Sequence, residues 1–453
     1  MANSLKYDIA KMLATERQMK KMTQEEIAEK LGTKKSNVSR FEKGDQNVGV
    51  DYIEAFSKAL GMNSSFVMEE VSEYIVSEHT DYSLCLYDEE LLSFSLRKST
   101  ELSCEILSVN KRKKKLLPLD LELSSDGLLS WLDRRIIPSN RAFVGEILTS
   151  LGLERTDIKG IIDICKGLSL NDSYWIIPKG SSLKFDDYNL FENDFSDILS
   201  LVAYTGRPFS SKKIVSSPEL TTNGVLRKAW RNKAEKGIWL YKAGTSDFAN
   251  AGNEPFSEYY AAQIAKAMGL HHVSYELENW KGILASKCEL FTSKDLSFVP
   301  IGSIVKEKSI EAVLELYKRL GDAYYQELCS MLVFDVLIYN EDRHFGNFGL
   351  LRDNKTGDFV GPAPIFDNGN SLLCYAMKDD FNDIKTYIAG RSTPYGKGFD
   401  ELLPKVLGRK QKAQLRKLIG FKFSESDICN LPSWRIKALE EILEDRIRYM
   451  LQY

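Results

Sequence analysis

The stretch from Ile338 to Ser371 constrains this chain most, because it sets three polar side chains between apolar runs. Asp342 and Asn347 follow one apolar run with the spacing D-x-x-x-x-N, and Asp367 follows a second run within the letters IFDNG. One carboxylate can orient and deprotonate a hydroxyl, while an amide oxygen and another carboxylate hold Mg²⁺ against nucleotide phosphates. The pattern predicts a phosphoryl-transfer site with Asp342 as catalytic base and Asn347 and Asp367 as metal ligands. The alternative is a polar loop whose Asp and Asn side chains cap helix ends.

The order of the residues around Asp342 narrows the choice of kinase family. Protein kinases place His-Arg before the catalytic Asp, whereas here Arg343 and His344 follow it. D-R-H-x-x-N with a later Phe-Asp-x-Gly resembles the HipA-like kinases, the toxin kinases of bacterial toxin–antitoxin systems. Phosphoinositide kinases share a related motif, so it indicates a kinase fold but no substrate. The resemblance implies ATP and Mg²⁺ as cofactors, with His344 packed under the loop or against a nucleotide phosphate.

Residues 1–61 predict a compact helical unit. Thr23 and Glu26 have the spacing of a capping box at the start of one helix, and a second short helix follows within 33–44. A helix-turn-helix with a polar, basic second helix is the layout that places side chains in the DNA major groove. The alternative is a protein-interaction domain whose basic face is only solvated.

The letters TQEEIAEKLG and VSRFEKG in this unit resemble Cro/CI-type repressor domains over nearly its whole length. The resemblance implies operator DNA as a partner, because amide and hydroxyl groups can read bases while Lys and Arg bind phosphate. The candidate DNA-binding residues are Gln24, Lys34, Lys35, Ser36, Asn37, Ser39 and Arg40. One such domain binds a half-site, so we expect a homodimer on DNA.

A hydroxyl-rich segment, 214–224, precedes two strand-like stretches, the second of which ends at Lys242. A loop that covers phosphates belongs here in a kinase fold, although this one has no G-x-G-x-x-G. The resemblance to HipA-like kinases implies nucleotide contacts through Thr221, Thr222, Asn223 and Gly224. It also implies autophosphorylation, with the candidates Ser216, Ser217, Thr221 and Thr222. The alternative is a plain surface loop.

Lys242 is expected to bind the α- and β-phosphates unless it is a strand-end surface lysine. A helix is predicted over 254–268, capped by Asn253, and the resemblance assigns its Glu258 as the partner that orients Lys242, with Glu254 as the rival. The E-x-F pattern after the next strand resembles the HipA-like hinge, so backbone groups of Glu289 and Phe291 are expected to meet adenine.

The fold class predicted is multidomain α+β. The predicted regions are a helix-turn-helix domain (1–65), a linker (66–80), a HipA-like accessory subdomain (81–205), and a bilobal kinase fold with a β-rich N-lobe (206–308) and a helical C-lobe (309–453). The basic run 111–115 predicts the tip of a β-hairpin, solvated or touching DNA, between 105–109 and 116–123. Segments 134–141 and 167–175 resemble accessory segments of HipA-like proteins, and we expect packing and capping roles for them.

The bulk properties agree with a cytoplasmic protein. The 453 residues carry a formal net charge of −3, so any binding to nucleic acid must be local. Seven cysteines lack C-x-x-C spacing, which favours reduced thiols. No apolar run approaches a membrane span and the start lacks a signal-peptide core, so no membrane partner is expected.

These patterns predict a self-regulating toxin kinase that phosphorylates Ser or Thr of a protein and also itself. The resemblance implies a target in translation, such as an aminoacyl-tRNA synthetase. One alternative is a DNA-binding regulator with a nucleotide-binding pseudokinase domain. The other is a small-molecule or lipid kinase.

Overall fold

The structure of the protein is a computed structural model. It describes residues 4–46, 48–62, 79–98, 102–155, 157–207, 216–233, 237–246 and 250–453. Within these ranges the architecture is α+β, with separate helical and sheet-containing regions, as the sequence predicts. Most of the predicted linker lies outside the described residues.

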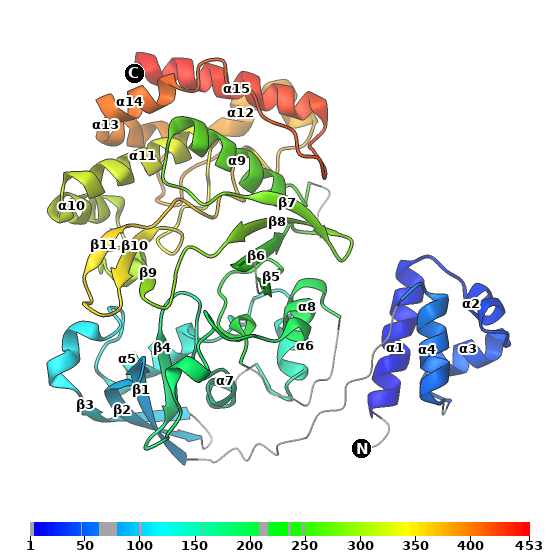
Figure 1. The fold of residues 1–453 in the computed structure, drawn as a ribbon. Helices are drawn as coiled ribbons and strands as arrows, with labels where there is room; N and C mark the ends of the chain where they lie inside the picture. The colour runs from blue at the N-terminus through cyan, green and yellow to red at the C-terminus, as the bar shows by residue number, and fades with distance from the viewer. Residues whose placement is uncertain are drawn as a thin grey trace.

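The N-terminal region is a group of four helices around its own apolar core (Figure 1). The helices are α1 (Ser4–Met19), α2 (Gln24–Lys30), α3 (Lys35–Glu42) and α4 (Val50–Ala59). Thr23 and Glu26 form the predicted capping box at the start of α2. Val38 and Phe41 on α3 are buried, so the polar residues between them face outward.

The accessory subdomain is a four-stranded antiparallel sheet in the order β3-β2-β1-β4, packed against helices. Its strands are β1 (His79–Leu86), β2 (Glu89–Lys98), β3 (Leu102–Val109) and β4 (Tyr174–Pro178). Its helices are η1 (Lys111–Leu116), α5 (Ser125–Arg134), α6 (Val144–Thr149), α7 (Ile158–Cys165), η2 (Phe185–Asp187) and α8 (Asp197–Thr205). The sheet begins two residues before the predicted boundary at Asp81.

The predicted hairpin around 111–115 is wrong. These residues form the 3₁₀ helix η1, and no strand follows it at 116–123. Lys113 pairs with Glu89 at 3.0 Å and Lys115 with Asp358 at 2.6 Å. Within the described ranges, no strand pairs with this segment. Its backbone is bound instead by Arg352, whose guanidinium donates to the carbonyls of Lys115 and Leu117.

The predicted N-lobe is an antiparallel sheet in the order β5-β6-β8-β7, covered by one long helix. Its elements are η3 (Pro218–Leu220), β5 (Lys228–Lys233), β6 (Gly237–Ala243), α9 (Glu254–Met268), β7 (Glu276–Trp280) and β8 (Ile283–Glu289). The helix has the predicted bounds and ends at Gly269, whose φ of 74° suits glycine. The predicted cap is wrong, because the Asn253 side chain donates to the Cys374 carbonyl and makes no capping bond.

The C-lobe contains the largest apolar core, centred on α11, and a small sheet in the order β11-β10-β9. It begins earlier than the predicted boundary at 309, because β9 pairs with β10 and η4 follows β9. Its strands are β9 (Leu296–Pro300), β10 (Gly349–Asp353) and β11 (Phe359–Pro362). Its helices are η4 (Ile301–Ser303), α10 (Ile310–Leu320), α11 (Asp322–Ile338), η5 (Asp379–Asp383), α12 (Ile384–Ala389), η6 (Phe399–Leu402), α13 (Leu403–Val406), α14 (Arg409–Arg416) and α15 (Ser433–Gln452).

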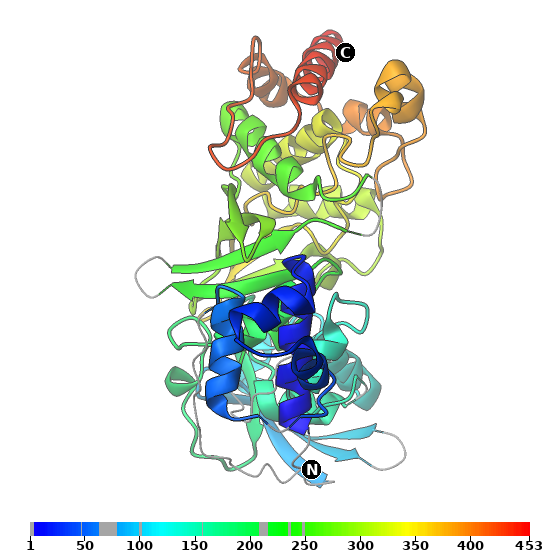
Figure 2. The ribbon, with the colours of Figure 1, turned by 90° about the vertical axis from the view of Figure 1, so that its right-hand side faces the viewer.

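Figures 1 and 2 both place the sheet of the N-lobe between the helical C-lobe and the accessory subdomain. Among the described residues, no helix is long and apolar enough to span a membrane. The end of β6 and the middle of β8 line the same cavity as the loop that follows α11.

Candidate phosphoryl-transfer site

The catalytic loop (residues 340–347) begins where α11 ends at Tyr339, which adopts a left-handed conformation. The Asp342 amide donates to the Asn340 side chain at 3.0 Å, and the Asn347 side chain donates to the Asp342 carbonyl at 2.9 Å. Both bonds use backbone atoms of Asp342, so its carboxylate stays exposed and lines a cavity of about 210 Å³.

Arg343 holds this loop from beneath, a role that the sequence did not reveal. Its buried guanidinium donates to Asp335 on α11 at 3.0 Å and to the Asn347 carbonyl at 3.0 Å. It also donates to the Phe366 carbonyl and, at 2.5 Å, to the Asn368 side chain, on either side of Asp367. One side chain therefore ties the catalytic base to the predicted metal ligand. The only signal in the sequence was Asp335, predicted to be a hydrogen-bonded structural carboxylate within an apolar helix.

Lys242, on β6, points at the predicted partners. Its ammonium donates to Glu258 on α9 at 2.5 Å and to the Asp367 carboxylate. Glu258 also accepts from the Asn368 amide at 2.8 Å. The rival Glu254 accepts instead from Thr245 and from Tyr375. The structure therefore brings Lys242 together with Glu258 rather than Glu254.

The charged groups in this cluster shift each other's pKa. Burial alone would lower the pKa of Lys242, but Asp367 and Glu258 hold it above its ordinary value. Burial would raise the pKa of Asp367, but Lys242 and Lys228 hold it below the usual range. Burial raises the pKa of Asp342, which His344 opposes and Asp367 reinforces. Lys242 and Asp367 are therefore an ion pair, while Asp342 is the more basic carboxylate.

Lys228, on β5, is a second lysine that the sequence analysis missed. It is the cross-strand partner of Lys242, so both side chains lie on the same face of the sheet. Its buried ammonium donates to the Asn223 carbonyl at 2.9 Å. Burial and the charge of Lys242 lower the pKa of Lys228 to about 7. Only the strand register could have revealed this pair.

The phosphate loop, residues 217–227, contains η3 and ends where β5 begins. Gly224 has a φ of 95°, and a Cβ there would lie 2.2 Å from the Lys228 ammonium, so a glycine is required. The predicted segment began at Ile214; residues 214 and 215 lie outside the described residues.

The four predicted autophosphorylation candidates all have bonded hydroxyls. Thr221 donates to the Leu168 carbonyl at 2.8 Å, and Thr222 donates to the Pro218 carbonyl at 2.6 Å. Ser216 donates to the Cys165 carbonyl at 3.3 Å, and Ser217 caps η3. None of these four hydroxyls is therefore presented freely to Asp342.

The predicted hinge follows β8. Glu289 ends the strand opposite Trp239, and the Phe291 ring packs 5.2 Å from Phe366 and 5.6 Å from Phe298. The ring of Phe291 therefore contacts the residue before Asp367, the predicted metal ligand. Its neighbour Leu290 extends the sheet, because its amide donates to the Ile238 carbonyl at 2.9 Å.

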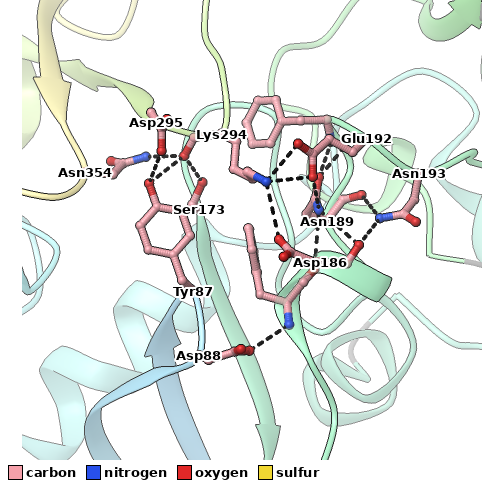
Figure 3. Close-up of polar contacts among 12 residues, drawn as sticks. Tyr87, Asp88, Ser173, Asp186, Asn189, Glu192, Asn193, Lys294, Asp295 and Asn354 are labelled. Atoms are coloured by element: carbon pink, nitrogen blue, oxygen red, sulfur yellow. Dashed lines mark hydrogen bonds and ion pairs between the residues drawn. The ribbon is translucent and has the colours of Figure 1, made fainter.

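The turn after the hinge is bonded to the accessory subdomain (Figure 3). The Lys294 carbonyl accepts from Tyr87 at 3.0 Å and from Ser173 at 2.6 Å, and the Lys294 ammonium pairs with Glu192 at 2.8 Å and Asp186 at 3.3 Å. The accessory subdomain therefore contacts both the hinge turn and the phosphate loop.

His344 lies at the exposed side of the catalytic loop, where its ring accepts from the Gly346 amide at 3.0 Å. It lines a larger cavity of about 1160 Å³, together with Thr221, Asn223 and Phe298. The prediction that His344 packs under the loop is therefore wrong, because Arg343 occupies that place. The predicted contact with a nucleotide phosphate stays a prediction.

Asn347 and Asp367 suit the predicted magnesium ion. Among the described residues, the only bond of the Asn347 amide group is donated through its nitrogen, and only Lys242 binds the Asp367 carboxylate. Both side chains therefore keep a free oxygen, the donor that Mg²⁺ prefers. In the same ranges no three His, Cys, Asp or Glu side chains are grouped to hold a metal. An ion held by these two residues would depend on nucleotide phosphates and water for its other ligands.

The predicted DNA-binding residues gather on one side of the four-helix group. Lys34, Lys35, Ser36 and Arg40 are exposed, whereas Gln24, Asn37 and Ser39 are half-buried. Gln24 donates to Glu42 at 2.7 Å, beside the buried Arg17–Glu42 ion pair. Asn37 donates to Thr33 at 2.9 Å, and Lys35 pairs with Glu25 at 2.8 Å. The basic side chains are thus exposed to solvent, whereas the side-chain amides of Gln24 and Asn37 are hydrogen-bonded within the domain.

Family models match two parts of the chain. Residues 13–67 match the helix-turn-helix model, and residues 212–419 match the model of the HipA-like C-terminal domain. The chain combines a helix-turn-helix domain with a HipA-like C-terminal domain. Both resemblances that the sequence suggested are confirmed.

The HipA-like domain has a curated relative. Over 147 residues the chain is 31% identical to the serine/threonine-protein kinase CtkA of Helicobacter pylori, a match that covers 28% of this chain and 43% of CtkA. The chain therefore spans less than half the length of this relative.

Two solved structures are similar. A crystal structure of H. pylori proinflammatory kinase CtkA has a TM-score of 0.40 and 18% identity, covering 50% of this chain and 93% of CtkA. A chain of the Shewanella oneidensis MR-1 complex of HipA, HipB and operator DNA has a TM-score of 0.47 and 13% identity, covering 82% of this chain and 98% of its own.

Proposed function

We propose that this protein is a HipA-like serine/threonine protein kinase that transfers the γ-phosphate of ATP to a protein hydroxyl. The observation that carries the proposal is the bonding of Lys242 to both Glu258 and Asp367, across one small cavity from Asp342. A lysine paired with a helix carboxylate, beside a metal-binding Asp and a catalytic Asp, is the arrangement that phosphoryl transfer requires. The homologous kinase CtkA supports it.

Each residue has a defined task in this proposal. Asp342 orients the acceptor hydroxyl and takes its proton, a task that its raised pKa favours. Lys242 binds the α- and β-phosphates, and Glu258 keeps its ammonium in place. Asn347 and Asp367 would hold Mg²⁺, which would supply charge neutralisation at the phosphates. The backbone of 221–224, the Lys228 ammonium and His344 would contact the phosphates, and Glu289 and Phe291 the adenine.

The helix-turn-helix domain would bind operator DNA as a homodimer, through the exposed basic residues of α3 and its flanks. In the cytoplasm, one chain would then regulate its own operon and phosphorylate a cellular target. The resemblance to HipA-like kinases makes a translation component, such as an aminoacyl-tRNA synthetase, the first target to test.

The same resemblance makes Ser216, Ser217, Thr221 and Thr222 candidates for autophosphorylation. Because their hydroxyls are bonded to neighbouring groups, the loop must leave its present position before any of them reaches Asp342. Autophosphorylation would therefore compete with the arrangement that binds nucleotide.

The test is incubation of the full chain with labelled ATP and Mg²⁺, beside Asp342→Asn and Asp367→Asn variants. Asp126→Asn, an exposed carboxylate on α5, is the matched control. We expect label on the wild type and the control only, with mass spectrometry locating it in 216–222 or on an added protein substrate.

Other outcomes support the alternatives. ATP binding without label on the chain, on added protein or on lysate proteins would favour a DNA-binding regulator with a pseudokinase domain. Label transferred only to lipids or small molecules would favour a small-molecule or lipid kinase. Fluorescence anisotropy with upstream DNA, comparing Arg40→Ala with wild type, tests the DNA-binding part, and unchanged affinity and salt dependence would contradict it.

A further inference from the structure

A buried arginine of the accessory subdomain contacts the phosphate loop. Arg141 precedes α6, and its side chain is completely buried. Its guanidinium donates to the Glu219 carbonyl at 2.6 Å and to the Lys228 carbonyl at 2.9 Å. A longer bond of 3.4 Å reaches the Thr222 carbonyl. Arg141 thus bonds the residues before and after Gly224 at once.

A carboxylate of the phosphate loop faces this guanidinium. The Glu219 carboxylate accepts from Arg141 at 2.5 Å and from the Trp230 amide on β5 at 2.7 Å. Both side chains of the pair are fully buried, so each charge is compensated chiefly by the other, and backbone groups bond to both. A planar guanidinium with donors on several edges holds two chain segments in one fixed geometry, whereas the donors of an ammonium rotate about a flexible stem.

The two residues after Arg141 also contact the phosphate loop. The Ala142 amide donates to the Val225 carbonyl at 2.8 Å, and the Phe143 ring lies 5.2 Å from the Arg227 guanidinium. Three consecutive residues of the accessory subdomain thus contact the loop between Glu219 and Lys228. The phosphate loop, which contains few glycines, is therefore supported by contacts from the accessory subdomain.

We infer that Arg141 is a positioning residue for nucleotide binding. It sets the separation of the two ends of the phosphate loop, and so places Lys228 and the backbone of 221–224 opposite Lys242. This inference rests on the proposed function, because it assumes that the loop covers a nucleotide. An apparent dissociation constant increases in inverse proportion to the fraction of protein in the competent arrangement. Loss of the Arg141 bonds therefore acts on ATP affinity before it acts on the chemical step.

The test compares Arg141→Lys with wild type in ATP titrations of the full chain. We expect the KM for ATP and the Kd of a fluorescent ATP analogue to rise about tenfold, with kcat changed less than about threefold. Arg446→Lys is the matched control, because Arg446 is a buried arginine that pairs with Asp400 in the C-lobe. Arg446→Lys should lower the melting temperature while leaving the KM for ATP unchanged.

Glu219→Gln separates positioning from stability. It removes the ion pair but leaves Arg141 its three backbone acceptors, so the KM for ATP should stay within about threefold of wild type although stability falls. An unchanged KM and Kd in folded Arg141→Lys, or equal increases in Arg141→Lys and Glu219→Gln, would overturn the inference.

Hydrogen exchange of the wild-type chain gives a readout that needs no variant. ATP should slow exchange of amides in 138–145 together with those in 218–228, because Arg141 and Ala142 join the two segments. Protection of 218–228 alone would overturn the inference but leave the proposed function intact. Failure of the wild type to bind the ATP analogue would overturn both.

Discussion

The catalytic loop and the phosphate loop face the same cavities but are held in different ways. The catalytic loop is supported by Arg343, which lies within it, and by Asp335 one helix turn before α11 ends. The phosphate loop is supported by Arg141, which lies 78 residues before Glu219 and in another subdomain. The first support lies within and just before the catalytic loop, whereas the second comes from a distant part of the chain. The spacing D-x-x-x-x-N marked Asp342 in the sequence, but neither arginine was marked as a support.

Asp342→Asn should have the largest effect, because it removes the base while leaving the support of the catalytic loop intact. We expect kcat to fall by roughly 10²–10⁴-fold, the usual contribution of a positioned general base. The melting temperature should stay unchanged, since the bonds that position Asp342 use its backbone. Kinetics with labelled ATP and calorimetry on the same sample measure both. If the Asp342→Asn variant keeps its activity, Asp342 is not the catalytic base.

Arg343→Leu should break the catalytic loop's support itself. It leaves Asp335 buried without a counter-charge, which costs about 3–5 kcal/mol of unfolding free energy. Arg448→Leu is the control, because its ion pair with Glu444 is exposed and worth at most about 0.5 kcal/mol. Urea denaturation measures both variants. A cost near that of the control would refute the central role given to Arg343.

The two loops should also respond differently to pH, because the phosphate loop contacts a titratable amine and the catalytic loop a guanidinium. The pKa of Lys228 is lowered to about 7 in the folded chain, whereas its ordinary value is 10.5. Between these values the unfolded chain binds the proton and the folded chain does not, so stability rises with pH by about 1 kcal/mol per unit.

The measurement is urea denaturation of wild type and Lys228→Met between pH 7 and pH 9. The stability of the wild type minus that of the variant should increase over this window. Lys115→Met, at an exposed lysine outside the site, corrects for general effects of losing an amine. A constant difference between wild type and Lys228→Met would show that Lys228 titrates normally.

Lys294→Ala should have the smallest effect. Its ammonium pairs with exposed carboxylates, whereas the bonds that join the hinge turn to Tyr87 and Ser173 use its backbone carbonyl (Figure 3). We expect a loss below about 1 kcal/mol in unfolding free energy and no change in the KM for ATP. A larger loss would mean that the ammonium itself joins the accessory subdomain to the hinge.

Much of the local structure followed from the sequence. The capping box at Thr23, the helix from Glu254 to Met268 and the pairing of Lys242 with Glu258 all depend on short motifs. Other segments did not follow from it. The run 111–115 forms η1 instead of a hairpin tip, and Arg352, far along the chain, donates to the Lys115 and Leu117 carbonyls.

The sequence by itself determined the two domain types and the three polar residues of the catalytic stretch, because helix caps, apolar periodicity and motif spacing act over a few residues. Only the tertiary structure decided that Arg343 lies under the catalytic loop, that Lys228 stands beside Lys242 and that Arg141 joins both ends of the phosphate loop. Each of these depends on strand register or on a buried guanidinium finding acceptors from distant segments. Burial makes such bonds obligatory, because an unpaired charge in the interior is too costly, but it does not mark their partners in the sequence.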